Sequence, residues 1–594
     1  MSFYDEEQLG RFQSVGSLLR LFKYTEGRRL FLTFCIVLSL LSACIQVVLP
    51  LLIRRGVDGY MLGPAGAGGA AAIAHLAWSY GGLLGVYLLL SWGSTLGLNA
   101  IGQAVVQAVR RDVFGHLHRL PIRYFDHNPV GRLTTRVAND SDALAEVFAS
   151  VIATAVGDLI MLTGVIAAMF VLDWRLALWV CSLLPFLAFL MHWFRHESQK
   201  IYRTNRVLLA RINAFFQECI QGLGIIKSFV GEARMAGRFA DINHQYYETE
   251  MRLVHTLAIF RPLVGTAATL GMGLVLWQGG LGVLRGAVTL GTLTAFLSYV
   301  KMVFSPIDEM AEKLNLFQQA IIASERLFRI LDTPCEESGK SVPEVQRGHI
   351  EFRSVSFAYD PDKPVLRDVS FEVRPTEKIA LVGPTGSGKT TIAGLLLGFY
   401  RLAGHGSGEI LVDGVRLEDW DVRALRRSIG WVQQDLFLFR TDLRHNIALF
   451  SPVSDEAVEK AVDASEARRL VEQHADGLSH PVNERGSSLS QGERQLLSFA
   501  RALVKDPPIL VLDEATASVD SVTEKAIQES LHHILQGRSA LIVAHRLSTI
   551  QEADRILVLK KGRLVEHGSH DELMAQNGLY AHLFRTQQLE RVEA

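Results

Sequence analysis

Six long apolar segments in the first half of the sequence limit the possible folds of this chain more than any other feature. Most of them approach or exceed the roughly 20 residues that an α-helix needs to cross the hydrocarbon core of a bilayer. A buried helix of a soluble protein can imitate one such segment, but six of them with no strand pattern between them favour membrane spans. The segments cover, approximately, residues 30–53, 73–98, 149–172, 176–194, 257–276 and 289–304.

The connections between these segments predict how the chain crosses the membrane. Residues 103–148 and 195–252 form two long connections that are rich in arginine and lysine, whereas the opposite connections are short and carry few basic residues. Because basic loops stay on the cytoplasmic side, we expect both long connections in the cytoplasm. An even number of spans then places both termini there too. The N-terminal residues MSFYDEEQLG are acidic and polar, so they show no signal peptide.

Net charge and cysteine content exclude some other functions. The formal net charge is −1 and no basic stripe is visible, so we expect no nucleic-acid partner. The five cysteines are scattered without the CxxC spacing of a metal or redox site. We interpret them as reduced packing residues.

The spacing of apolar positions outside the spans predicts two domains. We expect the membrane helices to continue into the cytoplasm and to turn back at short elbows near residues 128–140 and 221–233, where glycine or proline can end a helix. Residues 1–332 then form an all-α transmembrane domain with six helices. Residues 333–349 are a polar linker. Residues 350–594 alternate short strand patterns with helical ones, which is typical of an α/β domain.

The segment KIALVGPTGSGKTT, which ends at Thr391, predicts a phosphate-binding loop between a strand and a helix. Glycines there allow backbone N–H groups to surround phosphates. Lys389 is placed to pair with the outer phosphates, and the hydroxyl of Thr390 to face Mg²⁺. The sequence therefore predicts a site for ATP or GTP.

Other polar residues follow strand patterns of the same domain. PPILVLDEA ends in Asp513, a candidate Mg²⁺ ligand, and Glu514, a candidate for polarising the water that attacks the γ-phosphate. His545 closes the strand pattern SALIVAH, and Gln434 follows another in GWVQQD. His545 alone would more often be a structural histidine. Gln434 could reach the metal or the attacking water through its side-chain amide. A lone glutamine in a loop does not by itself indicate a function.

The segment SSLSQGERQ looks like a second phosphate-binding turn at the start of a helix, but it has no lysine. Ser490 is a candidate cap of that helix, whose N-terminal dipole and free N–H groups favour a phosphate. We expect that capping alone requires neither Gly492 nor Glu493.

Taken in order, these motifs resemble those of an ABC transporter of the exporter type, over essentially the whole chain. GPTGSGKTT matches the Walker A motif, VQQD the Q-loop, LSQGE the signature, ILVLDE the Walker B motif, ASVD the D-loop and AHR the H-loop. FAY supplies an A-loop aromatic, Tyr359. LSQGE followed by Arg494 departs from the commonest signature, and Arg440 in FRTD is unexplained.

The resemblance implies a fold, a reaction and a set of site residues. The fold is a helical transmembrane domain followed by an α/β P-loop nucleotide-binding domain, and the reaction is hydrolysis of ATP coupled to transport. Glu514 and His545 are the implied catalytic residues, and Thr390, Gln434 and Asp513 the implied Mg²⁺ ligands. The implied ATP-binding residues are Tyr359, Gly383, Pro384, Thr385, Gly386, Ser387, Gly388, Lys389, Thr390, Thr391, Gln434, Ser490, Gln491 and Gly492.

The resemblance also implies a partner. In this family the signature binds the ATP of a facing nucleotide-binding domain, and this sequence has one Walker A motif and one signature. We therefore expect a second half-transporter, either a copy of this chain or a related subunit. We expect an integral, multi-pass protein of the bacterial inner (cell) membrane.

Substrate and mode of action are less constrained. We expect hydrophobic or amphipathic substrates, drugs or lipids, moved out of the cytoplasm or inner leaflet by alternating access. An ATP-gated channel or a non-transporting regulatory membrane ATPase on the same fold is the alternative. Ionisable residues in or near the spans are cavity candidates or lie at membrane edges: Asp158, His192, His255, Arg261 and Asp308.

Overall fold

The computed structural model describes residues 15–61, 69–147, 153–340, 345–434, 436–513, 521–544, 550–551 and 553–593. The chain divides into two compact units. The first comprises residues 1–118 and 130–333, and the second residues 119–129 and 334–594. The short segment 119–129, which lies within the first half of the sequence, thus packs with the second unit.

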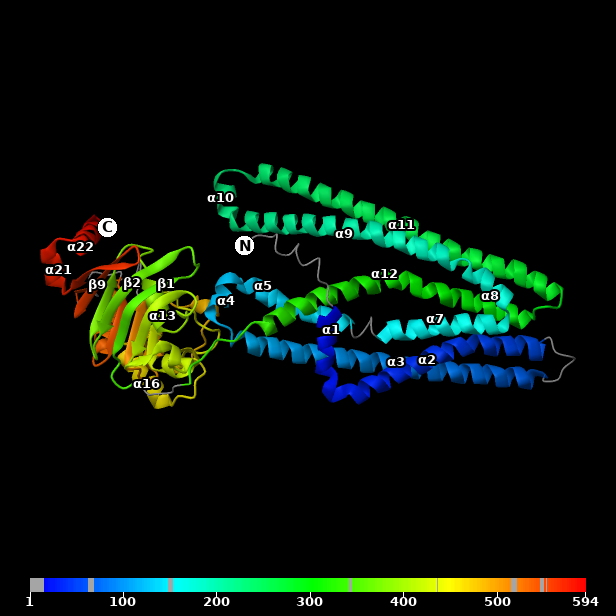
Figure 1. Ribbon diagram of the computed structural model, residues 1–594, viewed down its shortest axis with the longest axis horizontal. Helices are drawn as coiled ribbons and strands as arrows, with labels where there is room; N and C mark the ends of the chain where they lie inside the picture. The colour runs from blue at the N-terminus through cyan, green and yellow to red at the C-terminus, as the bar shows by residue number, and fades with distance from the viewer. Residues whose placement is uncertain are drawn as a thin grey trace. The chain divides into compact units, whose positions relative to one another are not determined.

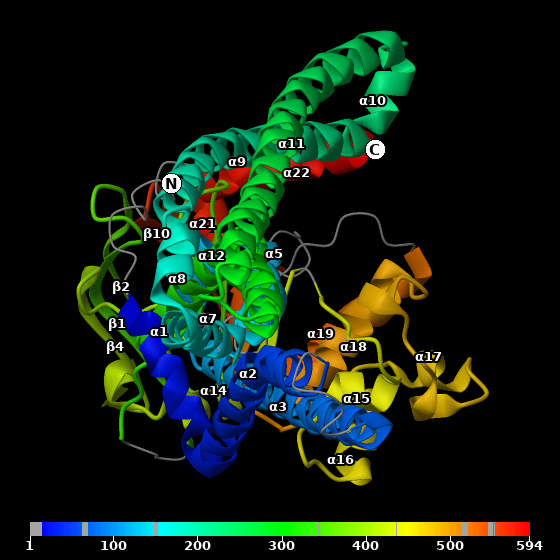
Figure 2. The same cartoon turned by 90° about the vertical axis from the view of Figure 1, so that its right-hand side faces the viewer.

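The first unit is helical throughout its described residues (Figure 1). The long helices pair in both views, α2 with α3 and α9 with α11 (Figure 2). Short segments, α1 (Val15–Leu21), α5 (Val130–Thr135), α6 (Ser141–Glu146) and α10 (Leu223–Ser228), connect or flank them. The longer helices are α2 (Arg29–Gly56), α3 (Gly69–Leu117), α7 (Ala153–Leu172), α8 (Trp174–Cys181), α9 (Leu184–Gln221), α11 (Glu232–Leu284) and α12 (Leu290–Asp332).

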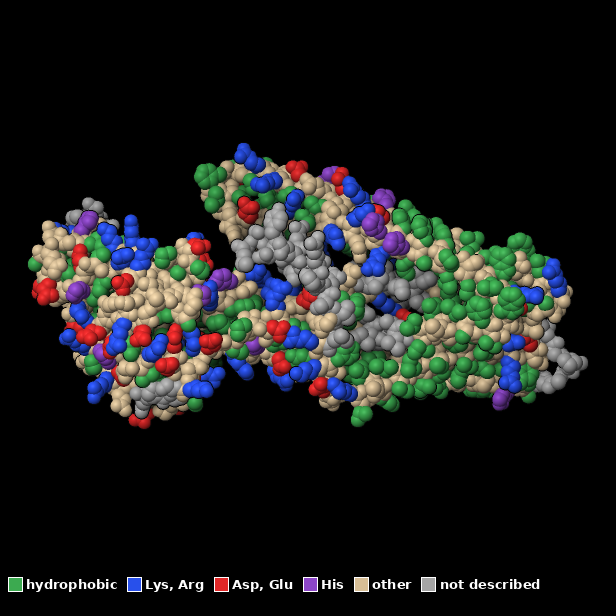
Figure 3. Space-filling model, viewed as in Figure 1, with side chains coloured by type: hydrophobic (Ala, Val, Ile, Leu, Met, Phe, Trp, Pro, Cys, Tyr) green, Lys and Arg blue, Asp and Glu red, His purple; other side chains and the backbone are tan. Residues whose placement is uncertain are grey.

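The expected membrane spans all coincide with apolar helices. Within the described residues, four helical segments are long and apolar enough to cross a membrane: Phe22–Met61, Ala71–Leu117, Trp174–Gln221 and Glu232–Leu284. Two shorter apolar helices, Gly157–Leu172 and Leu290–Ser305, match the other two expected spans. Figure 3 shows hydrophobic side chains gathered over one end of this unit, where α2, α3, α7 and α8 lie. The first unit is therefore the membrane-spanning part of the chain, and it is called the membrane unit below.

Local sequence explains where several of these helices begin and end. Asp173 caps α8, since its carboxylate accepts hydrogen bonds from the N–H groups of Arg175 and Leu176 at 2.9 and 3.0 Å. Thr289 caps α12 through Thr292. The hydroxyl of Tyr299 in α12 donates to the carbonyl oxygen of Val47 in α2 at 2.7 Å, which fixes these two helices to each other.

The first elbow does not lie where the sequence predicted it. We expected it at residues 128–140, but α3 already ends at Leu117 and the turn contains the short helix α4 (Ile122–His127). Pro121 stands at the N-cap of α4, and proline disfavours helical geometry in the residue before it. Residues 130–140 instead return to helix as α5 and a π-helical segment, Arg136–Asp140. The second elbow, α10, lies within the predicted residues 221–233.

Two sheets form the frame of the second unit. The first has the order β2-β1-β4-β5 and is antiparallel throughout. It consists of β1 (Ile350–Ala358), β2 (Pro364–Val373), β4 (Gly406–Val412) and β5 (Val415–Arg416). The second has the order β10-β9-β3-β8-β7-β6 and is parallel except at the edge strand β10. Its strands are β3 (Lys378–Val382), β6 (Ile429–Val432), β7 (Ile509–Asp513), β8 (Ser539–Val543), β9 (Arg555–Lys560) and β10 (Arg563–Gly568).

Helices cover both faces of the parallel sheet. Successive residues of β3 alternate between two cores, with Ala380 and Val382 in one and Ile379 and Leu381 in the other. Strands buried on both faces are typical of a parallel sheet in an α/β domain. The helices are α13 (Lys389–Leu396), α14 (Val422–Arg427), α15 (Leu443–Ala448), α16 (Asp455–Ala464), α17 (Arg468–Glu472), α18 (Gln491–Leu503), α19 (Ser521–Leu535), α21 (His570–Gln576) and α22 (Leu579–Glu593).

The cysteines only partly match the expectation of packing residues. Cys35, Cys44, Cys181 and Cys219 are free thiols. Cys35 is buried, but Cys44 and Cys335 are exposed. Scattered spacing argues against a metal site, but it does not predict burial.

Candidate nucleotide-binding site

The predicted phosphate-binding loop connects β3 to α13 and has the backbone of a phosphate cradle. Gly383, Gly386 and Gly388 all have positive φ angles, of 155°, 78° and 106°. A Cβ atom at Gly383 would lie 2.2 Å from the carbonyl oxygen of Leu559, and one at Gly388 would lie 2.6 Å from Leu366. Only glycine fits at these two positions.

Lys389 lies at the first position of α13 and bends back over this loop. Its Nζ atom donates hydrogen bonds to the carbonyl oxygens of Gly383 at 2.7 Å and Pro384 at 3.3 Å. Only 6% of the residue is exposed. Burial lowers the pKa of the ammonium group, and the nearby negative charge of Asp513 opposes that effect. Lys389 is thus a buried cation held above the loop.

The residues of the loop fit a bound phosphate. Ser387 is buried, and its hydroxyl oxygen has no hydrogen-bond partner among the described residues. A buried polar group without a partner is costly unless a ligand satisfies it. In the first turn of α13, Thr390 is exposed to solvent, whereas Thr391 is buried. Pro384, Thr385 and Gly386 form the exposed rim of the loop.

The parallel sheet brings the Walker B aspartate to the same edge as this loop. Asp513 is the last residue of β7, and β8 lies between β7 and β3. Asp513 is 7% exposed and close enough to Lys389 to affect its pKa. Buried carboxylates usually pair with a cation or bind a metal. This edge therefore combines a buried ammonium and a buried carboxylate.

Both expected catalytic residues fall outside the described part of the chain. Glu514 lies in residues 514–520 and His545 in residues 545–549, neither of which the structure describes. The described chain ends directly before each of them, at Asp513 and Ala544. Asp513 is paired in register with Val543 on the adjacent strand. The roles of Glu514 and His545 stay predictions.

Tyr359 follows β1 and reaches the helix after the phosphate loop. Its hydroxyl donates to Oγ1 of Thr391 at 3.1 Å. The ring makes edge contacts with Phe357 and Tyr400 at centroid distances of 5.1 and 4.9 Å, and 36% of the residue is exposed. Burial raises the pKa of the phenol, so the hydroxyl stays protonated and can donate. A ring held by two aromatic neighbours in a half-open environment suits stacking on a base.

The signature residues form the N-terminus of α18. Ser490 is the N-cap, and its side chain accepts from the N–H of Glu493 at 3.3 Å. The carboxylate of Glu493 accepts from the N–H of Ser490 at 2.7 Å, which completes a capping box. Our expectation that capping does not require Glu493 was wrong. Gln491 is exposed and Gly492 is buried.

Signature and phosphate loop belong to different helices of the chain. Helix α18 packs on β6, α15, α16 and α19, whereas α13 packs on β7 and β8. Within the described residues, no hydrogen bond or ion pair joins Ser490, Gln491 or Gly492 to the loop of residues 383–391. The signature and the phosphate loop therefore lie at the N-termini of two different helices.

The structure identifies Arg501 as a residue that sequence reasoning missed. Gln434 follows β6 and is exposed, and Arg501 of α18 anchors the chain just beyond it. The guanidinium donates to the carbonyl oxygens of Asn446 at 2.9 Å and Phe437 at 3.0 Å. Burial lowers its pKa to about 10. A lone arginine in a helix gives no sequence signal, because its partners are backbone carbonyls distant in sequence. Nothing in the structure explains the exposed Arg440.

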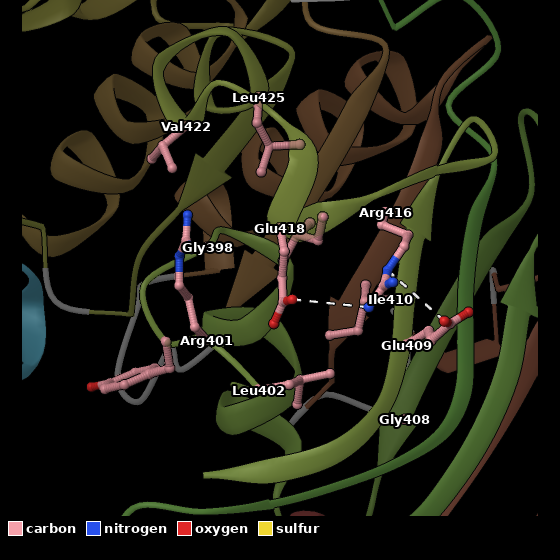
Figure 4. Close-up of a pocket in the computed structure, with 12 residues that line it drawn as sticks. Gly398, Arg401, Leu402, Gly408, Glu409, Ile410, Arg416, Glu418, Val422 and Leu425 are labelled. Carbon is pink, nitrogen blue, oxygen red and sulfur yellow. Dashed lines mark ion pairs between the residues drawn. The ribbon is translucent and has the colours of Figure 1, made fainter. Parts of the chain in front are cut away.

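A small cavity beside β4 is a separate feature of this unit (Figure 4). Its volume is about 20 Å³, enough for a water molecule but not for a nucleotide. Arg416 bridges Glu409 at 3.8 Å and Glu418 at 4.0 Å along its wall. Tyr400 and Leu402 form part of the same wall.

The four expected cavity residues whose side chains the structure describes fall into two groups. Asp158 in α7 forms an ion pair with Lys313 in α12 at 2.7 Å. His192, His255 and Arg261 are exposed in the described chain. The side chain of Asp308 lies outside the described residues.

An apolar helical unit joined to a P-loop α/β unit defines a membrane-embedded, ATP-binding transporter. The family model of the ABC transporter transmembrane region matches residues 32–307, and the ABC transporter family model matches residues 366–517. The chain belongs to the ABC transporter family. It is an exporter-type half-transporter and an integral multi-pass membrane protein. Its ATP-binding domain couples ATP hydrolysis to transport.

Similar proteins come from several bacteria. The probable multidrug resistance ABC transporter ATP-binding/permease protein YheH of Bacillus subtilis is 37% identical, with 86% of this chain and 76% of that protein covered. An ATP-dependent lipid A-core flippase of Nitrosococcus oceani is 34% identical, with 85% of each covered. The structure of a bacterial Atm1-family ABC exporter with ATP bound superposes with a TM-score of 0.80 at 28% identity, covering 94% of this chain and 98% of that one.

Proposed function

We propose that this chain exports hydrophobic or amphipathic molecules, drugs or lipids, from the cytoplasm or the inner leaflet by alternating access. The observation that carries the proposal is the apolar helical unit with a half-buried ion pair, Asp158–Lys313, fused to the ATP-binding unit. Ionisable groups among membrane helices usually contact a polar part of the cargo or partner each other. The names of the relatives, a multidrug resistance transporter and a lipid flippase, support these two substrate classes.

We infer that residues 1–332 form the transmembrane domain, 333–349 the linker and 350–594 the nucleotide-binding domain. Basic cytoplasmic loops support an orientation with both termini in the cytoplasm. The bacterial relatives support a bacterial inner membrane. Accessibility of single introduced cysteines to a membrane-impermeant thiol reagent, in whole cells and in inverted vesicles, tests this orientation.

We infer that ATP lies along the edge of the parallel sheet, from Tyr359 to the phosphate loop. Lys389 and the loop residues 383–391 hold the phosphates, and Thr390, Gln434 and Asp513 hold Mg²⁺. The metal, when bound, neutralises charge on the phosphate oxygens. Glu514 orients and deprotonates the attacking water, and His545 contacts the γ-phosphate region. The buried ammonium of Lys389 and the buried carboxylate of Asp513 at the same edge of the sheet support this arrangement.

We infer that two chains are needed for each ATP site. The signature helix α18 starts away from the phosphate loop of its own chain, and its N-terminal dipole suits the phosphate of a facing copy. The exposed apolar tip around α10 supports pairing, with Ile225, Phe229 and Val230 exposed by 68, 81 and 84%. Both the chain itself and a related subunit are candidate partners.

ATPase and transport assays on the purified chain in lipid vesicles test this function. We expect a dimer that hydrolyses ATP and moves a fluorescent lipid or a lipophilic dye only when ATP is hydrolysed. An ATP-gated channel would instead pass substrate down its gradient with a non-hydrolysable ATP analogue. A regulatory ATPase would hydrolyse ATP without transport of any candidate. An inactive monomer that a second chain activates would show an obligate heterodimer.

A further inference from the structure

One face of α9 carries a stripe of basic side chains just beyond its apolar half. His192, Arg195, His196, Arg203 and Arg206 are all exposed, and they are called the basic stripe below. An α-helix turns by about 100° per residue, so these five positions lie within about 100° of one another around the helix axis. Figure 3 shows arginine, lysine and histidine side chains gathered over α9 and α11, where the hydrophobic side chains of the membrane unit end.

The opposite face of α9 packs against α11, so the basic stripe is not part of that contact. The ring of Phe194 stacks on the ring of Phe260 in α11, with 4.1 Å between the centroids. Nδ2 of Asn205 donates to the carboxylate of Glu250 in α11 at 2.8 Å. Phe194 and Asn205 are both buried and lie on the side of α9 that points away from the stripe. The pairing of α9 with α11 therefore leaves the stripe uncovered.

The charge of the stripe is not neutralised within α9. This helix, which is described in full, has only two acidic residues, Glu197 and Glu218, and neither shares the face of the stripe. Glu197 instead pairs with Lys200 at 3.0 Å. Within the described residues, no hydrogen bond or ion pair involves the guanidinium groups of the stripe. Like charges three or four residues apart on a helix repel each other, so this arrangement is unfavourable without an anion.

A second copy of the chain is a poor complement to the stripe. Acidic side chains that follow the spans in the neighbouring helices are already paired with basic residues of the same chain: Asp142 with Arg110 at 2.7 Å, Asp140 with Arg326 at 3.7 Å and Asp332 with Arg20 at 2.7 Å. A facing copy would present the same paired acids. Charge complementarity therefore favours an anionic ligand.

The same side of α9 becomes apolar toward the membrane. Phe189 lies one turn before His192 and is 70% exposed. Arg195 directly follows the apolar segment, at the level where lipid headgroups begin, and Arg203 lies about 12 Å further along the helix. Guanidinium groups bind phosphates and carboxylates through paired hydrogen bonds. The face thus offers an apolar surface for an acyl chain next to a row of groups that bind anions.

We propose that the basic stripe binds the anionic headgroup of lipid substrates in the cytoplasmic leaflet, so that the chain moves anionic lipids in preference to neutral ones. The proposal rests on the proposed function, export of drugs or lipids, and names the substrate class of that function. Arg195, Arg203 and Arg206 supply the charge, and the exposed apolar side chains before them contact the acyl chains.

Transport of two fluorescently labelled lipids by the full chain in vesicles tests the proposal. The probes are phosphatidylglycerol, which is anionic, and phosphatidylcholine, which is neutral overall, with the same labelled acyl chain and at the same low mole fraction. We expect the wild type to move phosphatidylglycerol at least about tenfold faster, as the loss of a hydrogen bond to a charged group would predict. In the triple variant Arg195→Gln, Arg203→Gln, Arg206→Gln the ratio of the two rates should fall to about one, because the rate for phosphatidylcholine needs none of these contacts.

The triple variant Arg211→Gln, Arg234→Gln, Arg252→Gln is the matched control. It removes the same charge from exposed positions of α9 and α11 outside the stripe, so we expect the ratio of rates to stay at the wild-type value. An equal fall of the ratio in both triple variants would show general electrostatics and would overturn the proposal. A ratio near one in the wild type would also overturn it, as would a parallel loss of both lipid rates in the stripe variant.

Glycerol 3-phosphate separates a lipid site from a site for soluble anions, because it has the phosphate but no acyl chain. We expect it not to inhibit transport of phosphatidylglycerol, and full competition would overturn the assignment to lipid. Disulfide crosslinking between two copies that carry Arg203→Cys would show that a second copy covers the stripe, with the same consequence.

Failure of the inference can be told apart from failure of the proposed function. ATP-driven transport of both lipids or of a lipophilic dye without any headgroup preference would refute the inference alone. If the wild type moves neither the lipids nor the dye with ATP, the proposed function is wrong and the inference falls with it.

Discussion

Nζ of Lys313 lies 2.7 Å from Oδ2 of Asp158, and this ion pair joins α12 to α7 within the membrane unit. The side chains are 17% and 34% exposed, so neither charge is fully hydrated. Loss of one partner from a fully buried pair costs about 3 kcal/mol, because the remaining charge is left without compensation, and this half-buried pair should lose less.

We therefore expect Asp158→Asn to lower thermal stability in detergent and to impair transport. The charge-swapped double variant, Asp158→Lys with Lys313→Asp, should restore most of the stability. Thermal unfolding monitored by fluorescence measures this. Glu197→Gln is the control, because its pair with Lys200 is exposed and should contribute less than about 1 kcal/mol. If stability does not return in the double variant, the two residues act independently.

Glu514→Gln should retain ATP binding but reduce hydrolysis by at least about a hundredfold, because the carboxylate that orients the water is lost. Lys389 and Thr390 remain in this variant, so a fluorescent ATP analogue should still bind. Steady-state phosphate release measures the rate. Turnover close to that of the wild type would remove Glu514 from its proposed role.

Ser490→Arg should prevent closure of the ATP-bound dimer, because a bulky cation would occupy the N-terminus of α18 where the facing phosphate is proposed to bind. The capping box complicates this test, since any change at Ser490 also removes a cap of about 1 kcal/mol. Ser490→Ala removes the cap alone and is the control. Disulfide crosslinking across the dimer, with and without ATP, reports closure. Normal closure in Ser490→Arg would contradict the composite site.

Arg501→Met should destabilise the nucleotide-binding domain by about 2 kcal/mol and reduce ATPase activity. The carbonyl groups of Phe437 and Asn446 would lose their donor, and buried acceptors without a partner are costly. The segment after Gln434 would then lose its anchor on α18. Arg469→Met, at an exposed position of α17, is the control. Thermal unfolding and ATP hydrolysis should fall together in Arg501→Met alone.

The sequence by itself determined the features that depend on short spacings. Apolar length predicted the spans, because a helix must cover a bilayer of known thickness. The glycines, Lys389 and Asp513 were located from their order after strand patterns, because parallel strands place their carboxyl ends at one edge of the sheet. Even the capping box of Ser490 and Glu493 was present in the sequence as S-x-x-E, although we misread it.

Only the tertiary structure decided which distant residues meet. The position of the first elbow at α4 and the anchoring of the Gln434 segment by Arg501 both depend on contacts across long stretches of chain. Such contacts arise from the packing of whole elements. The acceptor is often a backbone carbonyl group, which every residue has, so the sequence does not mark it. Local spacing therefore determines what each segment can bind, and packing determines which segments act on one another.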